Sequence, residues 1–375
     1  MNRAYLALAD GSIFPGFHFG AEAVATGEVV FTTGMSGYQE VLTDPSFTGQ
    51  LVTMTAPHIG NTGINGDDPE STSGRPQVSG FIVRDPSPLP SNYRSEKTLS
   101  EYLRENGIVA IGGIDTRRLT RHLRDKGSQN GCIGTGNPDD LVARARSAPS
   151  MEGLDLVSQV TPKQAYRFTE NLGVFSPEVM GRPLVPAAGP FKVTVLDFGA
   201  KRNILRCLVS AGCELTCLPA NASESEILAT NPDGIFLSSG PGDPAALPHV
   251  VKTIEGLLGK KPMFGICLGH QLLARALGGT TSKLKFGHRG LNQPVLHLAT
   301  GRVQITLQNH GFVVDVESLK GRATTSHVHL NDGSSEGLLA EEARAFSVQY
   351  HPEAGAGPHD AFPLFEQFTQ WMSQS

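Results

Sequence analysis

The feature that most constrains this fold is a cysteine flanked by glycines in the segment Gly265–Gly269, which reads GICLG. An apolar stretch precedes the segment, and leucines and alanines at helical spacing follow it, so it predicts a sharp turn from a strand into a helix. Glycines two residues on either side of a nucleophile give the backbone room for such an elbow. The N–H groups at the start of a helix also favour a thiolate there. A cysteine between glycines is equally common as a small core residue, so the segment alone leaves both interpretations open.

Strand-like and helix-like segments alternate over the second half of the chain. An apolar run at Val193–Phe198 precedes a segment with helical spacing that begins at Asn203. The same order recurs at residues 234–238 and 262–266. This alternation predicts a doubly wound parallel α/β sheet over residues 191–375.

The first half has strand-like pieces separated by long loops rich in Gly, Pro and Ser. The length of 375 residues exceeds that of a typical single domain. We therefore predict a smaller mixed α/β domain at 1–150, a linker region at 151–190 and the α/β domain at 191–375. Within the linker region, Ser176–Pro190 combines four prolines with small residues.

Composition and charge exclude several classes of protein. The net charge is −5 and no long basic run occurs, which argues against nucleic-acid binding. The densest basic group is Arg117, Arg118, Arg121 and Arg124. It falls on a predicted amphipathic helix, where a solvated face is favoured over a partner contact. No apolar stretch is long enough to span a membrane and the N-terminus lacks a signal-peptide core, so we expect a cytoplasmic protein. The five cysteines lack zinc spacing, and we expect no metal site.

A second motif, Gln349–Glu353, reads QYHPE and supplies a base with a carboxylate two residues later. On an extended segment the side chains of His351 and Glu353 would point the same way, so the carboxylate would orient the imidazole. Cys267, His351 and Glu353 then have the roles of a hydrolase triad: nucleophile, base and orienting acid. Standing alone, the motif would also suit a surface histidine beside a turn proline.

A third motif, SGPGDP at Ser239–Pro244, follows a predicted strand. Its glycines would let backbone N–H groups approach a ligand closely, as an oxyanion hole requires, with the Leu268 N–H as a second donor. The chain has no Walker motif and no Gly-x-Gly-x-x-Gly, so we expect neither an ATP site nor a dinucleotide site in it.

Taken together, GICLGHQ, QYHPEA and SSGPGDP make residues 191–375 resemble the class I glutamine amidotransferase domain. That resemblance implies a flavodoxin-like sheet, a Cys-His-Glu triad and a γ-glutamyl thioester on Cys267. In the first half, GYQEVLTDPSFTGQ and GIDTRRLTRHLRDKGSQNGCI resemble the small subunits of carbamoyl phosphate synthetases, as do FGAKRNILR and QNHGF further on. The resemblance implies that glutamine is the substrate and that ammonia passes to a large subunit. It also implies that ATP and Mg²⁺ bind that large subunit, with no cofactor in this chain, and a role in arginine or pyrimidine synthesis or both.

Matching the motifs residue by residue implies a set of glutamine-binding positions. They are Ser46, Gly240, Gly242, Leu268, Gln271, Asn309, Gly311 and Phe312. Ser46 would bring the N-terminal domain to the pocket. Two positions depart from the family's usual pattern, Ser239 where Asn is frequent and Tyr350 where Gly is common, and both concern only the local shape of the pocket.

Three other functions remain to be distinguished. Another class I amidotransferase subunit would lack the DPSF and GIDTRRLTRHL segments. A stand-alone cysteine hydrolase acting on γ-glutamyl peptides would turn over fully without a partner. A binding module without catalysis would not need an intact Cys, His and Glu set.

Overall fold

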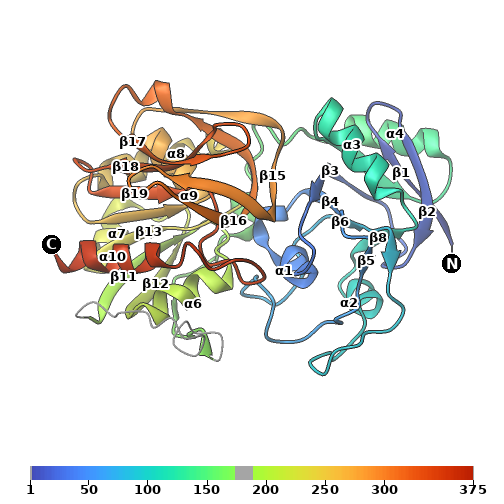
Figure 1. Cartoon of the computed structure of the whole chain (residues 1–375), viewed down its shortest axis with the longest axis horizontal. Helices are drawn as coiled ribbons and strands as arrows, with labels where there is room; N and C mark the ends of the chain where they lie inside the picture. Colours follow the sequence, from blue (N-terminus) through green and yellow to red (C-terminus); the bar gives the residue numbers. More distant parts are fainter. Residues whose placement is uncertain (1, 174–188, 375) are drawn as a thin grey trace. The chain divides into compact units, whose positions relative to one another are not determined.

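The computed structural model describes residues 2–173 and 189–374. They form two compact units, Met1–Leu154 with Leu284–Gly290 and Asp155–Lys283 with Leu291–Ser375 (Figure 1). Most of the predicted Pro-rich linker segment, Ser176–Pro190, lies outside the described residues. Residues 155–173 of the predicted linker region belong to the second unit. The domain boundaries drawn from the sequence stay a prediction.

The second unit is built on a parallel sheet whose strand order matches the predicted class. Five strands neighbour one another in the order β12-β11-β13-β14-β19, and each neighbouring pair is parallel. Their bounds are β11 (Phe191–Asp197), β12 (Cys213–Pro219), β13 (Gly234–Leu237), β14 (Met263–Ile266) and β19 (Ala345–Val348). Numbered along the chain, this is the 2-1-3-4-5 order of flavodoxin-like folds. The prediction of a doubly wound α/β fold is confirmed.

Helices pack against both faces of this sheet because successive strand residues point to opposite sides. One core cluster joins residues such as Val193 and Phe264 to α6 (Arg202–Ser210) and α10 (Pro363–Ser373). The other joins Ile235 and Met263, among others, to the helices on the opposite face. Those helices are α7 (Glu224–Ala229), α8 (Pro248–Leu257) and α9 (Leu268–Ala276). A short helix, α5 (Val157–Val160), precedes the sheet along the chain.

Antiparallel strands extend the sheet to ten strands, which the sequence did not predict. Beyond β19 the order is β18-β17-β15-β16, and β10 lies at the opposite edge beside β12. The added strands are β10 (Tyr166–Phe168), β15 (Thr280–His297), β16 (Arg302–Asp315), β17 (Thr324–His329) and β18 (Ser335–Ala340). The middle of β15, residues 284–290, is counted with the first unit.

The first unit is a closed barrel with strands in the order β1-β2-β8-β6-β4-β3-β9. The strands are β1 (Arg3–Leu8), β2 (Ile13–His18), β3 (Ala25–Thr32), β4 (Gln50–Met54), β6 (Gly80–Ile82), β8 (Val109–Gly112) and β9 (Gln129–Gly134). Helices α1 (Tyr38–Thr43), α2 (Leu99–Glu105), α3 (Thr116–Lys126) and α4 (Pro138–Ser147) connect or flank them, and β5 (His58–Ile59) pairs with β7 (Asp85–Pro86). A mixed α/β unit was predicted; its closure into a barrel was not.

Helix α3 presents the basic group noted in the sequence. Its four arginines are exposed, while Leu119 and Leu123 are buried, as an amphipathic helix requires. The guanidinium of Arg118 lies 4.3 Å from the ring centroid of Phe14. Among the described residues, no helix is both long enough and apolar enough to cross a membrane.

Candidate active site

The elbow predicted around Cys267 is present between β14 and α9. Cys267 has a φ of 53°, in the left-handed region that a side chain rarely adopts, and it is 3% exposed. A side chain at Gly269 would overlap the carbonyl of Leu237, and one at Gly265 would lie 2.9 Å from the backbone of Gly269. Both glycines are therefore needed for the close approach of strand and helix. The strained backbone at Cys267 lies between these two close-packed glycines.

His351 and Glu353 meet as predicted, although the backbone between them is not extended. His351 lies in an isolated bridge with Leu307, and the chain turns at Pro352 and Glu353. The Nδ1 of His351 donates to Oε1 of Glu353 at 2.7 Å, and both side chains are fully buried. The turn, rather than the alternation of a strand, brings the carboxylate to the ring.

Glu353 has a second ionic partner, Lys201, which the sequence did not single out. The Nζ of Lys201 lies 3.0 Å from Oε1 of Glu353, and the lysine side chain is only 3% exposed. Burial raises the pKa of Glu353, but the charges of Lys201 and His351 outweigh it and hold the pKa at about 2. The carboxylate is therefore ionised over the whole neutral range.

His351 is held in its protonated form by the same group of charges. Burial lowers its pKa, yet the negative charge of Glu353 raises it to about 10 against the opposing charge of Lys201. An interaction with the thiol of Cys267 also raises the pKa of His351. The Nε2 of His351 has no hydrogen-bond partner among the described residues. The imidazole thus has its Nδ1 fixed by Glu353, while its ring lies close enough to Cys267 to interact with the thiol.

The loop at Ser239–Pro244 packs beside the nucleophile. A side chain at Gly240 would overlap the carbonyl of Phe198 and lie 2.9 Å from Cδ2 of Leu268. Gly242 has a φ of 92°, which favours glycine. The backbone of the loop therefore comes to the start of α9, where the Leu268 N–H belongs to the first turn and has no acceptor within the helix. Backbone N–H groups at this place suit an oxyanion.

Strand β16 brings three further predicted residues to the same region. The thiol of Cys267 lies 3.6 Å from the carbonyl oxygen of Asn309. The carbonyl oxygen of Phe312 accepts from Nε2 of Gln271 at 3.0 Å. Gly311 lies between Asn309 and Phe312 on the strand. Gln271 is in the first turn of α9, where its N–H donates to the carbonyl of Cys267 at 3.1 Å. The structure thus places Asn309 and Gln271 against Cys267, and Phe312 against Gln271.

Ser46 lies in the first unit, in the short 3₁₀ turn Pro45–Phe47 that is capped by Asp44. It is 6% exposed, and its hydroxyl has no hydrogen-bond partner among the described residues. Its predicted contact with glutamine stays a prediction.

The sequence motifs assign no role to three residues that the structure places at the site. Lys201 pairs with Glu353, and Asn203 donates from Nδ2 to the carbonyl of Glu353 at 2.7 Å. Gln349 accepts from Nε2 of Gln271 at 3.0 Å. All three lie in segments already singled out, FGAKRNILR and QYHPE, so the motifs were a signal even though no role was assigned to these positions.

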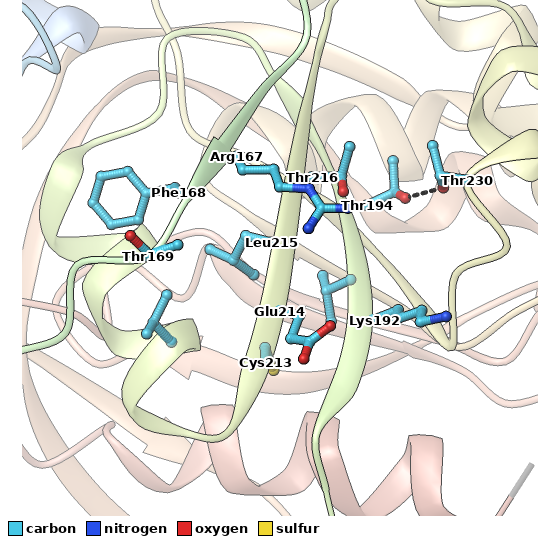
Figure 2. Close-up of a pocket in the computed structure, with 12 residues that line it drawn as sticks. Arg167, Phe168, Thr169, Lys192, Thr194, Cys213, Glu214, Leu215, Thr216 and Thr230 are labelled. Atoms are coloured by element: carbon cyan, nitrogen blue, oxygen red, sulfur yellow. Dashed lines mark hydrogen bonds between the residues drawn. The ribbon is translucent and has the colours of Figure 1, made fainter.

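A surface cavity of about 410 Å³ lies elsewhere in the second unit (Figure 2). It is lined at the first residues of β11 and β12, including Lys192, Cys213 and Glu214. Cys267 follows the last residue of β14, so the triad is at the carboxyl ends of the parallel strands. Ligands of open α/β sheets bind at those carboxyl ends, so this cavity is not part of the candidate active site.

The geometry suits nucleophilic attack on a carbonyl carbon. A buried thiol at a strained elbow interacts with an oriented imidazolium, and backbone N–H groups are available for the developing negative charge. These are the parts that acyl transfer requires.

Comparison with known proteins gives two family matches and close relatives along the whole chain. Residues 6–133 match "Carbamoyl-phosphate synthase small chain, CPSase domain", and residues 194–371 match "Glutamine amidotransferase class-I". A carbamoyl phosphate synthase small chain of Syntrophotalea carbinolica is 55% identical over 375 residues, which cover 100% of this chain and 98% of the relative. Small chains of Synechocystis sp. and Vibrio vulnificus are 52% and 49% identical, each over 99% of this chain and over 96% and 98% of the relative.

Proposed function

The chain belongs to the carbamoyl phosphate synthase small chains and is the glutaminase subunit of that enzyme, and from this premise we propose how its residues divide the chemistry. The observation that supports the proposal best is the buried contact of 2.7 Å between His351 and Glu353, with His351 interacting with Cys267. In the proposal Cys267 is the nucleophile, His351 transfers the protons and Glu353 orients the imidazole.

The first half of the reaction forms a thioester. The thiolate of Cys267 attacks the amide carbon of glutamine, and the carbonyl oxygen becomes an oxyanion. Backbone N–H groups of Leu268 and of the loop with Gly240 and Gly242 stabilise that charge. The carbon–nitrogen bond then breaks, and His351 protonates the leaving nitrogen to give ammonia. Glu353 keeps Nδ1 as the donor, so that Nε2 is the atom that delivers the proton.

The second half releases glutamate. With the proton gone, the neutral imidazole of His351 takes a proton from water as the water attacks the thioester carbon. The second tetrahedral intermediate collapses and expels the sulfur of Cys267, which restores the thiolate and the imidazolium.

Substrate binding is assigned to the residues that surround this centre. Gln271, Asn309, Gly311 and Phe312 would line the pocket for glutamine, and Ser46 would add a hydroxyl from the first unit. The contacts of Asn309 with the thiol and of Phe312 with Gln271 support the assignment for β16 and α9.

A small chain works with a large-chain partner, and we propose that this partner receives the ammonia and combines it with bicarbonate. ATP and Mg²⁺ would act there, since this chain has no phosphate-binding motif of the Walker type. A cytoplasmic location completes the proposal, supported by five cysteines that are all free and buried.

The test is the Cys267→Ser variant in complex with the large chain. A serine hydroxyl does not ionise appreciably near neutral pH, so the thioester should not form. We expect ATP-dependent carbamoyl phosphate synthesis from added ammonia and none from glutamine. Glutamine-dependent synthesis near the wild-type rate would refute the role of Cys267. An intact complex that makes no carbamoyl phosphate from ammonia would count against the delivery of ammonia to a synthase.

A further inference from the structure

The side chain of Gln349 contacts Gln271 at the centre of the site, and the proposed mechanism assigns no role to this contact. It lies two residues before His351, and its side chain is fully buried. Its Oε1 accepts a hydrogen bond from Nε2 of Gln271 at 3.0 Å. Its own backbone N–H donates to the carbonyl of Glu336 on β18 at 2.9 Å, so the residue is fixed by the sheet.

The hydrogen bonds of Gln271 determine which way its amide group faces. A primary amide has two N–H donors on one atom and an acceptor on the other. The first donor of Gln271 goes to the carbonyl oxygen of Phe312, which can only accept, and the second goes to Oε1 of Gln349. With both donors used inside the protein, Gln271 can offer a ligand only its oxygen.

The contact with Gln349 joins three parts of the site. Gln271 is in the first turn of the helix that begins after Cys267, Phe312 is on β16, and Gln349 leads into the segment with His351 and Glu353. Without Gln349 the amide of Gln271 would keep a single fixed partner and would rotate more freely. The contact therefore sets the orientation of a residue assigned to substrate binding.

We infer that Gln349 is a positioning residue for glutamine hydrolysis: it fixes the amide of Gln271 so that the oxygen faces the substrate. The inference rests on the proposed function, because it assigns Gln271 to the glutamine pocket. An oxygen presented in this way suits a substrate with N–H donors, such as the ammonium group of an amino acid. Gln349 acts through Gln271 and need not touch the substrate itself.

Two substitutions separate the acceptor from the rest of the side chain. Gln349→Met keeps the length but removes the acceptor, so Gln271 loses one fixed partner. Gln349→Glu keeps an oxygen that accepts, whether the carboxyl group is ionised or not. Gln349→Met should raise the KM for glutamine about three- to tenfold, which corresponds to the loss of one hydrogen bond. Its kcat should change less, because the contact acts on binding. Gln349→Glu should stay within about threefold of wild type.

The decisive experiment is a double-mutant cycle with Gln271→Met, in which glutamate release by the complex with the large chain is measured. If Gln349 acts through Gln271, the KM of Gln271→Met should not rise further when Gln349→Met is added. A purely structural role would give effects that multiply. Gln39→Met is the matched control, since Gln39 is also a buried glutamine with both amide atoms bonded, to the backbone of Asn65 in the first unit. It should lower the thermal midpoint without changing the KM for glutamine.

The outcomes distinguish the inference from the function on which it rests. Multiplying effects, an unchanged KM in Gln349→Met, or the same rise in Gln349→Glu as in Gln349→Met would each overturn the positioning role while the wild-type complex remains an active glutaminase. If Gln349→Met does not fold, Gln349→Asn replaces it in the cycle, because the shorter side chain withdraws the acceptor from Gln271. A raised KM for glutamine that does not rise further in combination with Gln271→Met is then the supporting result. A wild-type complex that releases no glutamate from glutamine would overturn the proposed function and the inference with it.

Discussion

The Lys201→Met substitution should measure how strongly the buried ion pair stabilises the second unit. Lys201 lies directly before α6 and its Nζ is 3.0 Å from the carboxylate of Glu353, with both side chains almost fully buried. Methionine has a similar length and no charge, so the substitution removes the charge and leaves most of the packing. Among the described residues, His351 would then remain as the ionic partner of Glu353.

The magnitude follows from the pKa of Glu353. Its fall from 4.5 to about 2 in the folded protein corresponds to about 3 kcal/mol of stabilisation of the carboxylate. Lys201 and His351 share this effect, with the charge of Lys201 contributing more than that of His351. We expect Lys201→Met to cost about 2 to 3 kcal/mol, less than the ~3–5 kcal/mol typical of breaking a buried pair, because His351 stays in place. For a unit of this size that corresponds to about 4–12 °C in the unfolding temperature.

The stabilisation by the ion pair of Lys201 and Glu353 should depend on pH. The pKa of the Glu353 carboxyl is lowered by folding, so its stabilisation is complete above about pH 4.5 and is lost as the pH falls toward 2. The difference between wild type and Lys201→Met should therefore be large at pH 7 and shrink as the pH is lowered from 5 to 3. Thermal unfolding of the two proteins at a series of pH values measures this directly.

Lys192→Met is the control, because Lys192 is an exposed lysine on β11 of the same unit. It should change the unfolding free energy by no more than about 0.5 kcal/mol. By the same scaling, the control should shift the unfolding temperature by no more than about 2 °C. An unfolding temperature of Lys201→Met within about 2 °C of that of Lys192→Met at pH 7 would refute the stabilisation by Lys201.

Two further predictions concern the roles within the site. Glu353→Gln should retain part of the glutaminase activity, whereas His351→Asn should lose nearly all of it. The reason is that the carboxylate orients the base and the imidazole transfers the protons. A larger loss of activity in Glu353→Gln than in His351→Asn, measured by steady-state kinetics, would reverse these roles. Ser46→Ala should raise the KM for glutamine more than it lowers kcat. The expected loss of binding free energy is roughly 1.5–3 kcal/mol, that of a hydrogen bond to a charged group. An unchanged KM would remove Ser46 from the pocket.

The parallel sheet could be predicted from the sequence because its signals are local. Val193–Phe198 is an apolar run long enough for one strand, and the helix after it is marked by residues such as Ile204, Leu205 and Leu208, all of them buried. A strand buried on both faces reads as a continuous apolar run, and the order of strands and helices then limits the topology. The elbow at Cys267 was predicted for the same reason, since its strand, glycines and helix are adjacent in the chain.

The barrel of the first unit could not be predicted, because its closure depends on distant pairs. Strand β3 lies antiparallel to β9, with Ala25 opposite Ile133 and Gly27 opposite Gly131. These strands contain glycines, which weaken the strand signal, and no local pattern specifies which partner each strand takes. The antiparallel extension of the second sheet was missed for a similar reason, since alternation of strands and helices stops before β15.

The segment FGAKRNILR marks the position of Lys201 but not its role, because a lysine is expected at the surface. Only the fold brings it to a carboxylate that is more than a hundred residues away, at 3.0 Å. There is nevertheless a physical reason for a cation at this place. When Cys267 is a thiolate and His351 is protonated, the three triad residues together carry one excess negative charge. A buried excess charge costs several kcal/mol unless a counter-charge is buried with it. Lys201 supplies that counter-charge at the oxygen of Glu353 that also accepts from His351. The four residues together are therefore neutral when Cys267 is a thiolate, and a triad deduced from motifs alone lacks the lysine that balances this charge.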